Sequence, residues 1–202
     1  MSARVPPLPA PGDLPPHMPH ARDNAFRRLC RAVVRRAGWQ LAGTFPDCPR
    51  LVVIVAPHSS WWDGIWGLLF KVGMGANVTF IAKKEVFAGP LGWLLRRLGG
   101  LPVDRSAPGG VVKQLAARFA RGEGLWLAIT PEGTRKHVQR WKSGYWHIAR
   151  GAGVPVLPVY IDYPSRSIGV GPLGQPAADV EEDLQRMRDF YAPWQGKHRG
   201  VG

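Results

Sequence analysis

The chain of 202 residues lacks several features that mark particular classes of protein. Its two cysteines, Cys30 and Cys48, are too few for a disulfide framework or a four-cysteine metal site. No uncharged apolar run reaches the ~18 residues of an ordinary membrane-spanning helix. Residues 1–20 hold seven prolines and no apolar segment, which does not fit a secretory signal. We therefore expect residues 1–22 to form a disordered, proline-rich lead.

Acidic residues are also scarce. The chain has 14 Asp and Glu against 27 Lys and Arg, which gives a net charge of +13. Such a charge predicts an anionic partner: nucleic acid, anionic lipid, or a phosphorylated or CoA-type substrate. No signature of a common nucleic-acid-binding module is present, so we expect no nucleic acid as partner. Apolar residues make up 45% of the chain and nine are Trp. This predicts one globular domain over residues 23–202.

The first periodic segment, residues 24–38, is predicted to be an amphipathic helix that starts at Asn24 and stops at Gly38. No acidic residue occurs from Asn24 to Pro46. Its apolar residues recur at helical spacing, namely Phe26, Leu29, Cys30, Val33, Val34 and Ala37. Its polar face carries five arginines, namely Arg27, Arg28, Arg31, Arg35 and Arg36. The helix either covers a sheet or lies on an anionic lipid surface.

The remainder of the chain alternates between strand-like and helix-like segments. We expect strands at residues 51–56, 78–82, 101–103, 125–129 and 154–161. We expect helices at residues 63–74, 90–98, 111–121, 143–150 and 178–191. This alternation predicts an α/β layered domain with a mainly parallel central sheet flanked by helices and preceded by the amphipathic N-terminal helix.

Polar residues follow the buried strand at residues 51–56, where α/β sheets place their sites. His58 comes directly after this strand, and Asp63 lies five residues further on, near the start of the next helix. A turn of this length can bring the carboxylate to one imidazole nitrogen and leave the other nitrogen free as a base. Alternatively, Asp63 only caps the helix and His58 is an ordinary loop residue. His198 is expected to lie in the C-terminal tail.

Two further loops follow predicted strands and carry arginines. Residues 99–105 contain a glycine pair, then a short predicted strand, and then Arg105. An ordinary turn with an ion pair on the surface would give the same pattern. Residues 130–135 contain Gly133, which allows close backbone approach, Thr134, which offers a hydroxyl, and Arg135, whose planar fork suits phosphate. The alternative is a tight turn, with Arg135 in a structural ion pair with Glu132.

The order and spacing of these blocks resemble the glycerolipid acyltransferases, the lysophosphatidic-acid acyltransferase superfamily. The matching segments are HSSWWD at 58–63, GLPVDR at 100–105, PEGTR at 131–135 and VPVLP at 154–158. The resemblance covers residues 39–163 and is most similar to a short bacterial branch of the superfamily. It implies transfer of a fatty acyl group from acyl-CoA or acyl-carrier protein to a lipid hydroxyl, without a metal or a bound cofactor.

The same resemblance implies roles for individual residues. His58 takes the proton from the acceptor hydroxyl and Asp63 orients His58, with no acyl-enzyme intermediate. Arg105 and the loop after the fourth predicted strand hold the phosphate of the acceptor and shape its site; the loop residues are Glu132, Gly133, Thr134 and Arg135. The implied partners are the acyl thioester and a lysophospholipid such as 1-acylglycerol 3-phosphate.

The chain also departs from the family pattern, and this leaves alternatives open. Pro57 precedes His58 where many members carry Asn or Asp, and Trp61 and Trp62 occupy positions where smaller or polar residues are usual. An amino-acid lipid, acylated on nitrogen or oxygen, is therefore a second possible acceptor. A basic protein that binds anionic surfaces without catalysis is a third. We expect peripheral, monotopic attachment to the cytoplasmic face of the inner membrane through residues 26–41 and 86–97.

Overall fold

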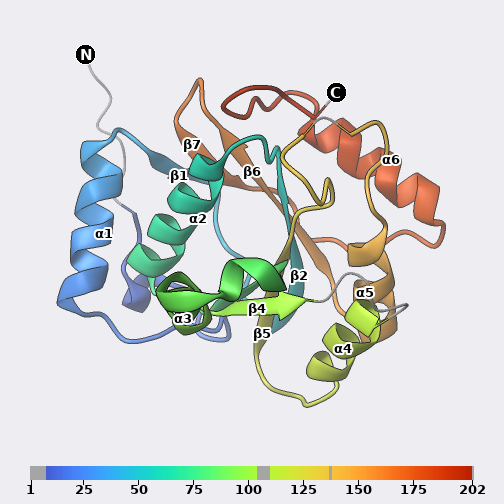
Figure 1. The fold of residues 1–202 in the computed structure, drawn as a ribbon, viewed down its shortest axis with the longest axis horizontal. Helices are drawn as coiled ribbons and strands as arrows, with labels where there is room; N and C mark the ends of the chain where they lie inside the picture. The colour runs from blue at the N-terminus through green and yellow to red at the C-terminus, as the bar shows by residue number, and fades with distance from the viewer. Residues whose placement is uncertain (1–7, 104–109, 137, 202) are drawn as a thin grey trace.

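A seven-stranded sheet forms the centre of the molecule (Figure 1), which is a computed structural model that describes residues 8–103, 110–136 and 138–201. In the order β1-β7-β6-β2-β5-β3-β4, the strands from β6 to β4 run parallel, while β7 and β1 run the other way. The strands are β1 Gln40–Ala42, β2 Arg50–Ala56, β3 Val78–Lys83, β4 Gly100–Val103, β5 Leu125–Ile129, β6 Val156–Asp162 and β7 Ser167–Val170. The predicted α/β class with a mainly parallel sheet is confirmed.

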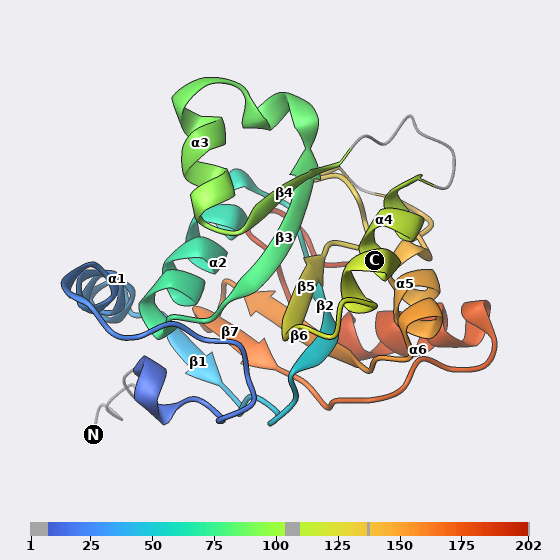
Figure 2. The same ribbon diagram turned by 90° about the horizontal axis from the view of Figure 1, so that it is seen from below.

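Helices cover both faces of this sheet (Figure 2). They are α1 Ala25–Arg36, α2 Trp61–Met74, α3 Gly89–Arg97, α4 Gly110–Phe119, α5 Gly144–Ala152 and α6 Val180–Tyr191, with short 3₁₀ turns at η1 Pro11–Asp13 and η2 Lys84–Phe87. Helices α1, α2 and α3 lie on one side, and α4, α5 and α6 lie on the other. None of the helices in the described ranges is long and apolar enough to cross a membrane.

The central strand β2 shows why its sequence is apolar at successive positions. Leu51 and Val53 point into the core beneath α1 and α2, whereas Val52 and Ile54 point into the core beneath α4, α5 and α6. A parallel strand covered on both faces has no solvent-facing side, so apolar alternation disappears. Strand β2 is therefore held rigidly in the middle of the sheet, and the segment that follows it starts from a fixed point.

Helix α1 packs on the domain, which is the first of the two alternatives that its sequence left open, and attachment to lipid stays a prediction. Cys30 and Val34 are buried, and the helix packs against α2. Phe26, Leu29 and Val33 from the same apolar stripe remain exposed. The rest of the domain therefore covers only one side of the apolar stripe on α1, and the other side of the stripe faces solvent.

The expectation that residues 1–22 are disordered is wrong for residues 8–22; residues 1–7 lie outside the described part. Leu8, Leu14 and Met18 are buried in the core beneath α1 and α2. The carbonyl of Pro19 accepts a 2.8 Å hydrogen bond from the Asn77 N–H. Proline stiffens this segment and lowers the entropy lost when it docks, while its three apolar side chains provide the driving force.

Candidate active site

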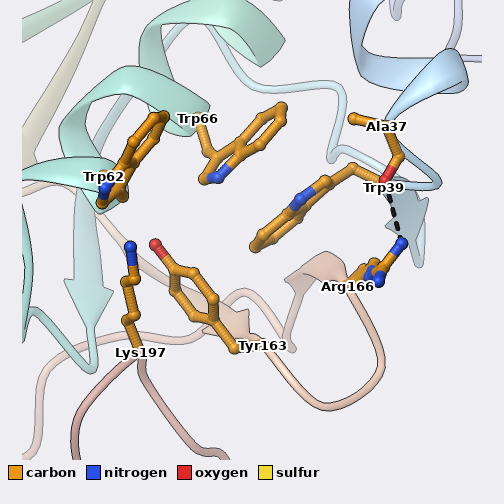
Figure 3. Close-up of a pocket in the computed structure, with 7 residues that line it drawn as sticks. All are labelled: Ala37, Trp39, Trp62, Trp66, Tyr163, Arg166 and Lys197. Atoms are coloured by element: carbon orange, nitrogen blue, oxygen red, sulfur yellow. Dashed lines mark hydrogen bonds between the residues drawn. The ribbon is translucent and has the colours of Figure 1, made fainter.

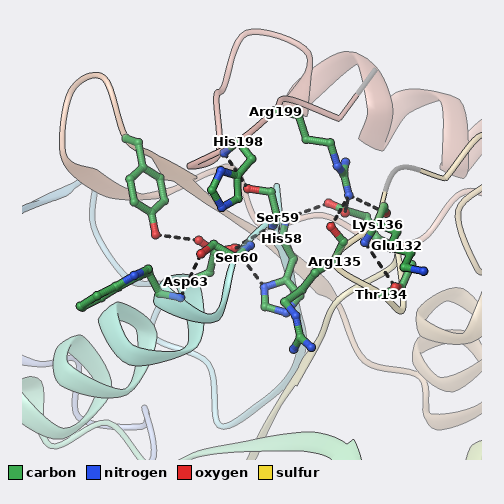
Figure 4. A network of polar contacts seen from close by, with 12 residues as sticks. His58, Ser59, Ser60, Asp63, Glu132, Thr134, Arg135, Lys136, His198 and Arg199 are labelled. Atoms are coloured by element: carbon green, nitrogen blue, oxygen red, sulfur yellow. Dashed lines mark hydrogen bonds and ion pairs between the residues drawn. The ribbon is translucent and has the colours of Figure 1, made fainter.

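Three loops that carry polar side chains meet at one edge of the sheet. They follow β6, β2 and β5, which are adjacent parallel strands and so present their carboxyl ends at the same edge. The loop after β2 carries His58, the loop after β5 carries Glu132 to Arg135, and Tyr163 follows β6. The fold therefore brings the first and third predicted blocks together (Figure 4). Arg105, from the second block, lies outside the described residues.

His58 and Asp63 are paired as the sequence predicted. The chain leaves β2 through a cis peptide bond between Ala56 and Pro57, and Ser60 then caps α2. Nδ1 of His58 lies 3.3 Å from Oδ2 of Asp63. The His58 side chain is 21% exposed, while that of Asp63 is fully buried. The pairing leaves Nε2 as the imidazole nitrogen that is not directed at the carboxylate.

Asp63 also caps the start of α2. The sequence offered the cap and the pairing with His58 as alternatives, and the structure contains both. Its Oδ2 accepts hydrogen bonds of 2.7 Å from the N–H groups of Ser59 and Ser60, and its Oδ1 accepts one of 2.7 Å from the Tyr163 hydroxyl. Burial by itself raises the pKa of this carboxyl. The hydrogen bonds from His58, Tyr163 and Ser60 outweigh burial and hold the pKa of Asp63 below its ordinary value. The carboxylate is therefore charged and fixed in position beside His58.

Glu132 is buried at 1% exposure and connects the loop after β5 to the loop after β2. Its Oε1 accepts a 2.8 Å hydrogen bond from the backbone N–H of His58, and its Oε2 accepts one of 2.9 Å from the Arg199 guanidinium. Burial raises the pKa of Glu132, and these two partners oppose the effect. Its ion-pair partner is thus Arg199, and not Arg135 as one interpretation of the sequence allowed.

Arg135 projects from the same loop onto the face of an indole ring. Its guanidinium carbon lies 3.6 Å from the centre of the Trp61 ring, and both side chains are exposed, Trp61 at 64%. Thr134 is exposed too, and its hydroxyl accepts a 3.3 Å hydrogen bond from the Lys136 N–H. The turn needs Gly133, whose φ is +65° and whose position leaves only 3.1 Å between an added Cβ and the Lys142 side chain. Cationic side chains therefore gather around this turn.

The C-terminal segment that follows α6 takes part in the site, which the sequence did not indicate. Ser59 Oγ accepts a 3.2 Å hydrogen bond from the N–H of His198, a residue expected to lie in a tail. Gly196 packs so closely that an added Cβ would be 2.6 Å from the same Ser59 oxygen. Arg199 donates further hydrogen bonds to the carbonyl oxygens of Arg135 and Lys136. This segment has no periodicity, so sequence reasoning had no signal for its contacts.

The arrangement supplies a base and a cationic surface. Within the described ranges, no three His, Cys, Asp or Glu side chains are placed to hold a metal ion. An imidazole oriented by a buried carboxylate can accept a proton from a hydroxyl or amine. Arginine at the rim can bind a phosphate through its planar fork. The geometry therefore suits proton removal from an acceptor that carries an anionic group.

The chain is similar to several known proteins. A sequence model described as Acyltransferase matches residues 46–162. A 1-acyl-sn-glycerol-3-phosphate acyltransferase of Streptococcus pneumoniae is 29% identical over 68% of this chain and 54% of its own length. A lyso-ornithine lipid O-acyltransferase of Pseudomonas aeruginosa is 34% identical over 67% of this chain and 51% of its own length. The chain thus spans about half the length of these relatives.

A solved structure shares the fold. The crystal structure of the 1-acyl-sn-glycerophosphate acyltransferase of Thermotoga maritima matches with a TM-score of 0.57 and 20% sequence identity. The match covers 84% of this chain and 80% of that one. The likeness supports the layered α/β architecture described above.

Proposed function

The chain belongs to the Acyltransferase family, and from this membership we propose that it moves a fatty acyl group from a thioester to the hydroxyl of a lysophospholipid-type acceptor such as 1-acylglycerol 3-phosphate. The thioester is acyl-CoA or acyl-carrier protein. The observation that carries the proposal is His58, held by a buried carboxylate at Nδ1 and partly exposed beside the cationic turn at Arg135. The names of the relatives support the same class of acceptor.

In the proposed reaction, Nε2 of His58 accepts the proton of the acceptor hydroxyl as its oxygen attacks the thioester carbonyl carbon. The new C–O bond forms, the C–S bond breaks, and the thiolate leaves and takes the proton back from His58. Asp63 stabilises the imidazolium that forms between these two proton transfers. The acceptor is itself the nucleophile, so no residue of the chain becomes acylated.

We assign the other site residues to positioning and binding. Arg135 binds the acceptor phosphate after leaving the face of Trp61, and Gly133 and Thr134 shape the turn that presents it. Arg105 is proposed as a second phosphate ligand. Glu132 fixes the backbone of His58 through its 2.8 Å hydrogen bond and does not touch substrate, because its carboxylate is buried between protein donors.

An amino-acid lipid is the second candidate acceptor. It is favoured by the similarity to the protein named lyso-ornithine lipid O-acyltransferase, which is 34% identical over 67% of this chain. His58 and Asp63 could remove the proton from either acceptor. The choice between the two acceptors therefore depends on how the site binds their headgroups. An ornithine headgroup carries both an ammonium group and a carboxylate and has a net charge near zero, so the cationic turn at Arg135 attracts it less than it attracts a phosphate. The charge of the site therefore favours the phosphate-bearing acceptor.

We also propose that the protein attaches peripherally to the cytoplasmic face of the inner membrane. Among the described residues, nine of the ten large apolar side chains that are exposed lie on α1, α2 and α3. They are Phe26, Leu29, Val33, Trp61, Trp62, Ile65, Leu91, Trp93 and Leu94. Aromatic and aliphatic side chains beside arginines suit the boundary between lipid and water. These helices adjoin one another on one side of the sheet (Figure 2).

The proposed function is tested by incubating the purified protein with labelled acyl-CoA or acyl-carrier protein and one acceptor at a time. The acceptors are 1-acylglycerol 3-phosphate, lyso-ornithine lipid and a lipid with a primary amine. The proposal predicts a labelled diacyl product with the phosphate-bearing acceptor. Product with lyso-ornithine lipid alone would transfer the assignment to the second candidate. Absence of product with every acceptor and both donors would refute acyl transfer.

A further inference from the structure

A wide-open cavity of about 330 Å³ lies beside the candidate active site, and of the residues that line it only Trp62 has been given a role so far, at the edge of the proposed membrane-attachment surface. Its wall contains Trp39, Trp62, Trp66, Tyr163, Arg166 and Lys197 (Figure 3). The Tyr163 hydroxyl donates to Oδ1 of Asp63, while Nδ1 of His58 faces Oδ2 of the same carboxylate. A ligand in the cavity is therefore a near neighbour of the proposed base.

Three of the aromatic rings of the wall hold one another in place. Trp39 is buried, and its ring stacks on that of Trp66 at 4.8 Å with an angle of 25° between their planes. The edge of Tyr163 meets Trp39 at 5.1 Å. These contacts fix the rings without a ligand. Trp39 is only 4% exposed and supports the wall from behind, so the ring faces open to a ligand are those of the more exposed Trp62 and Trp66. Indole faces of this kind bind planar ring systems by stacking.

Two cations lie at opposite ends of the aromatic wall (Figure 3). Arg166 adopts a left-handed backbone conformation with a φ of 50°, and its guanidinium donates a 3.3 Å hydrogen bond to the Ala37 carbonyl. Lys197 places its ammonium group 4.7 Å from the centre of the Trp62 ring. None of the residues that line the cavity is acidic. The wall is therefore complementary to a flat group that carries anionic groups on two sides.

This combination distinguishes between the molecules that the proposed reaction involves. A fatty acyl chain has no charge and would desolvate both cations without pairing them. A glycerol phosphate headgroup has one anionic group and no ring to stack. The nucleotide part of CoA has a purine, a 3′-phosphate on its ribose and a 5′-diphosphate. A volume of about 330 Å³ is at the lower end of small-molecule sites, which suits part of a ligand better than a whole one.

We propose that this cavity binds the adenine nucleotide of a CoA thioester, with the purine against the indole rings and the phosphates at Arg166 and Lys197. The inference rests on the proposed function and deepens it, because it selects CoA as the carrier of the acyl group. Acyl-carrier protein presents the same pantetheine phosphate without a purine nucleotide. The cavity therefore favours the CoA thioester over the carrier-protein thioester.

Direct binding of adenosine 3′,5′-bisphosphate, measured by isothermal titration calorimetry on the full chain, tests the site without catalysis. Lys197→Gln and Trp62→Leu change exposed side chains, so the core remains intact. Each should weaken binding by about tenfold, because Lys197→Gln removes one contact to a charged phosphate and Trp62→Leu removes one ring-stacking contact. Lys113→Gln on α4 removes the same charge from an exposed position outside the cavity and should leave binding unchanged.

Kinetics with the two donors provide the second readout. Trp62→Leu removes a contact to the purine, so it should raise KM for acyl-CoA by about tenfold, with kcat retained, and leave KM for acyl-carrier protein unchanged. Lys197→Gln and Arg166→Gln should each raise KM for acyl-CoA, and the one that binds the pantetheine phosphate should raise KM for both donors. Equal effects of Trp62→Leu on both donors, or no saturable binding of the bisphosphate, would overturn the inference and leave acyl transfer intact. Displacement of the bisphosphate by 1-acylglycerol 3-phosphate alone would assign the cavity to the acceptor. Bisphosphate binding without acyl transfer would refute only the proposed function.

Discussion

Replacing Arg199 by Gln tests whether the C-terminal segment positions the proposed base. Arg199 donates to Glu132 at 2.9 Å and to the carbonyl oxygen of Arg135 at 3.2 Å, and it also contacts the Lys136 carbonyl. Glu132 in turn accepts the N–H of His58. The substitution leaves a buried carboxylate without its cation, although Arg199 itself contacts no reacting atom. We therefore treat Arg199 as a positioning residue.

The size of the effect follows from burial. Removing one partner of a buried ion pair costs about 3–5 kcal/mol. The Arg199 side chain is 20% exposed, so water partly screens the pair and we expect a loss just below this range, about 2–3 kcal/mol, in the free energy of unfolding. Looser placement of His58 should lower kcat/KM by about 10- to 100-fold, equivalent to about 1.4–2.7 kcal/mol. Glu132→Gln combined with Arg199→Gln should destabilise less than Arg199→Gln alone, because no buried charge remains unpaired.

The pH dependence separates positioning from a general loss of stability. Burial already raises the pKa of Glu132, and removal of Arg199 raises that pKa further. The folded variant then holds a proton that the unfolded chain lacks, so its unfolding free energy falls as pH rises. Its activity relative to wild type should instead rise with pH, because an ionised Glu132 accepts the His58 N–H more strongly.

Stopped-assay kinetics and urea unfolding from pH 4.5, the ordinary pKa of a glutamate, up to pH 9 measure both quantities for Arg199→Gln. Arg140→Gln is the matched control, since it breaks an exposed ion pair with Glu181. A variant that loses stability but keeps wild-type kcat/KM at every pH would refute the positioning role. If Arg140→Gln lowered the unfolding free energy and kcat/KM as much as Arg199→Gln does, the effect would not be specific to the contacts of Arg199, and this too would refute the positioning role.

Three further predictions use other parts of the molecule. Partial burial, reinforced by Arg27, lowers the pKa of Lys71 from 10.5 to about 8, so at pH 7 the folded state holds a partly buried charge. Lys71→Met should raise the unfolding free energy by about 1–2 kcal/mol at pH 7, and this gain should shrink between pH 8 and 10.5 in urea titrations. Arg135→Lys should chiefly raise the KM of a phosphate-bearing acceptor, because an ammonium lacks the planar fork, and a change confined to the donor KM would contradict this. Replacing Phe26 and Leu29 by Ser should reduce co-sedimentation with anionic vesicles while activity on detergent-dispersed acceptor persists; unchanged sedimentation would contradict attachment through α1.

The elements with strong periodicity were predictable from the sequence. The strand at residues 125–129 is the observed β5, and the predicted helix at 63–74 differs from α2 only at its start. Strands β1 and β7 were missed because segments of three and four residues carry little pattern, although β4, which is as short, was predicted. The proline-rich residues 8–22 were misjudged because their docking depends on isolated apolar side chains such as Met18.

The candidate site was predictable where it depends on local spacing. Asp63 lies close enough to His58 in the chain for one turn to pair them, and the blocks at residues 58–63 and 131–135 follow adjacent parallel strands. Tyr163 and Arg199 were missed because they reach the site from distant parts of the chain. Tyr163 directly follows β6, so a polar residue at that strand end was a signal that could have been used. Arg199 offered no such signal, since its contacts depend on the path of the chain after α6.

The central claim is that His58 and Asp63 act as one unit in acyl transfer. The most direct measurement is the rate of phosphatidate formation from acyl-CoA and 1-acylglycerol 3-phosphate by wild type, His58→Ala, Asp63→Ala and the double variant. Each single substitution should lower kcat/KM by about 10²- to 10⁴-fold, the contribution typical of a general base. The double variant should be little slower than the slower single one, because coupled groups are not additive. Losses that multiply in the double variant, or full activity in His58→Ala, would contradict the account.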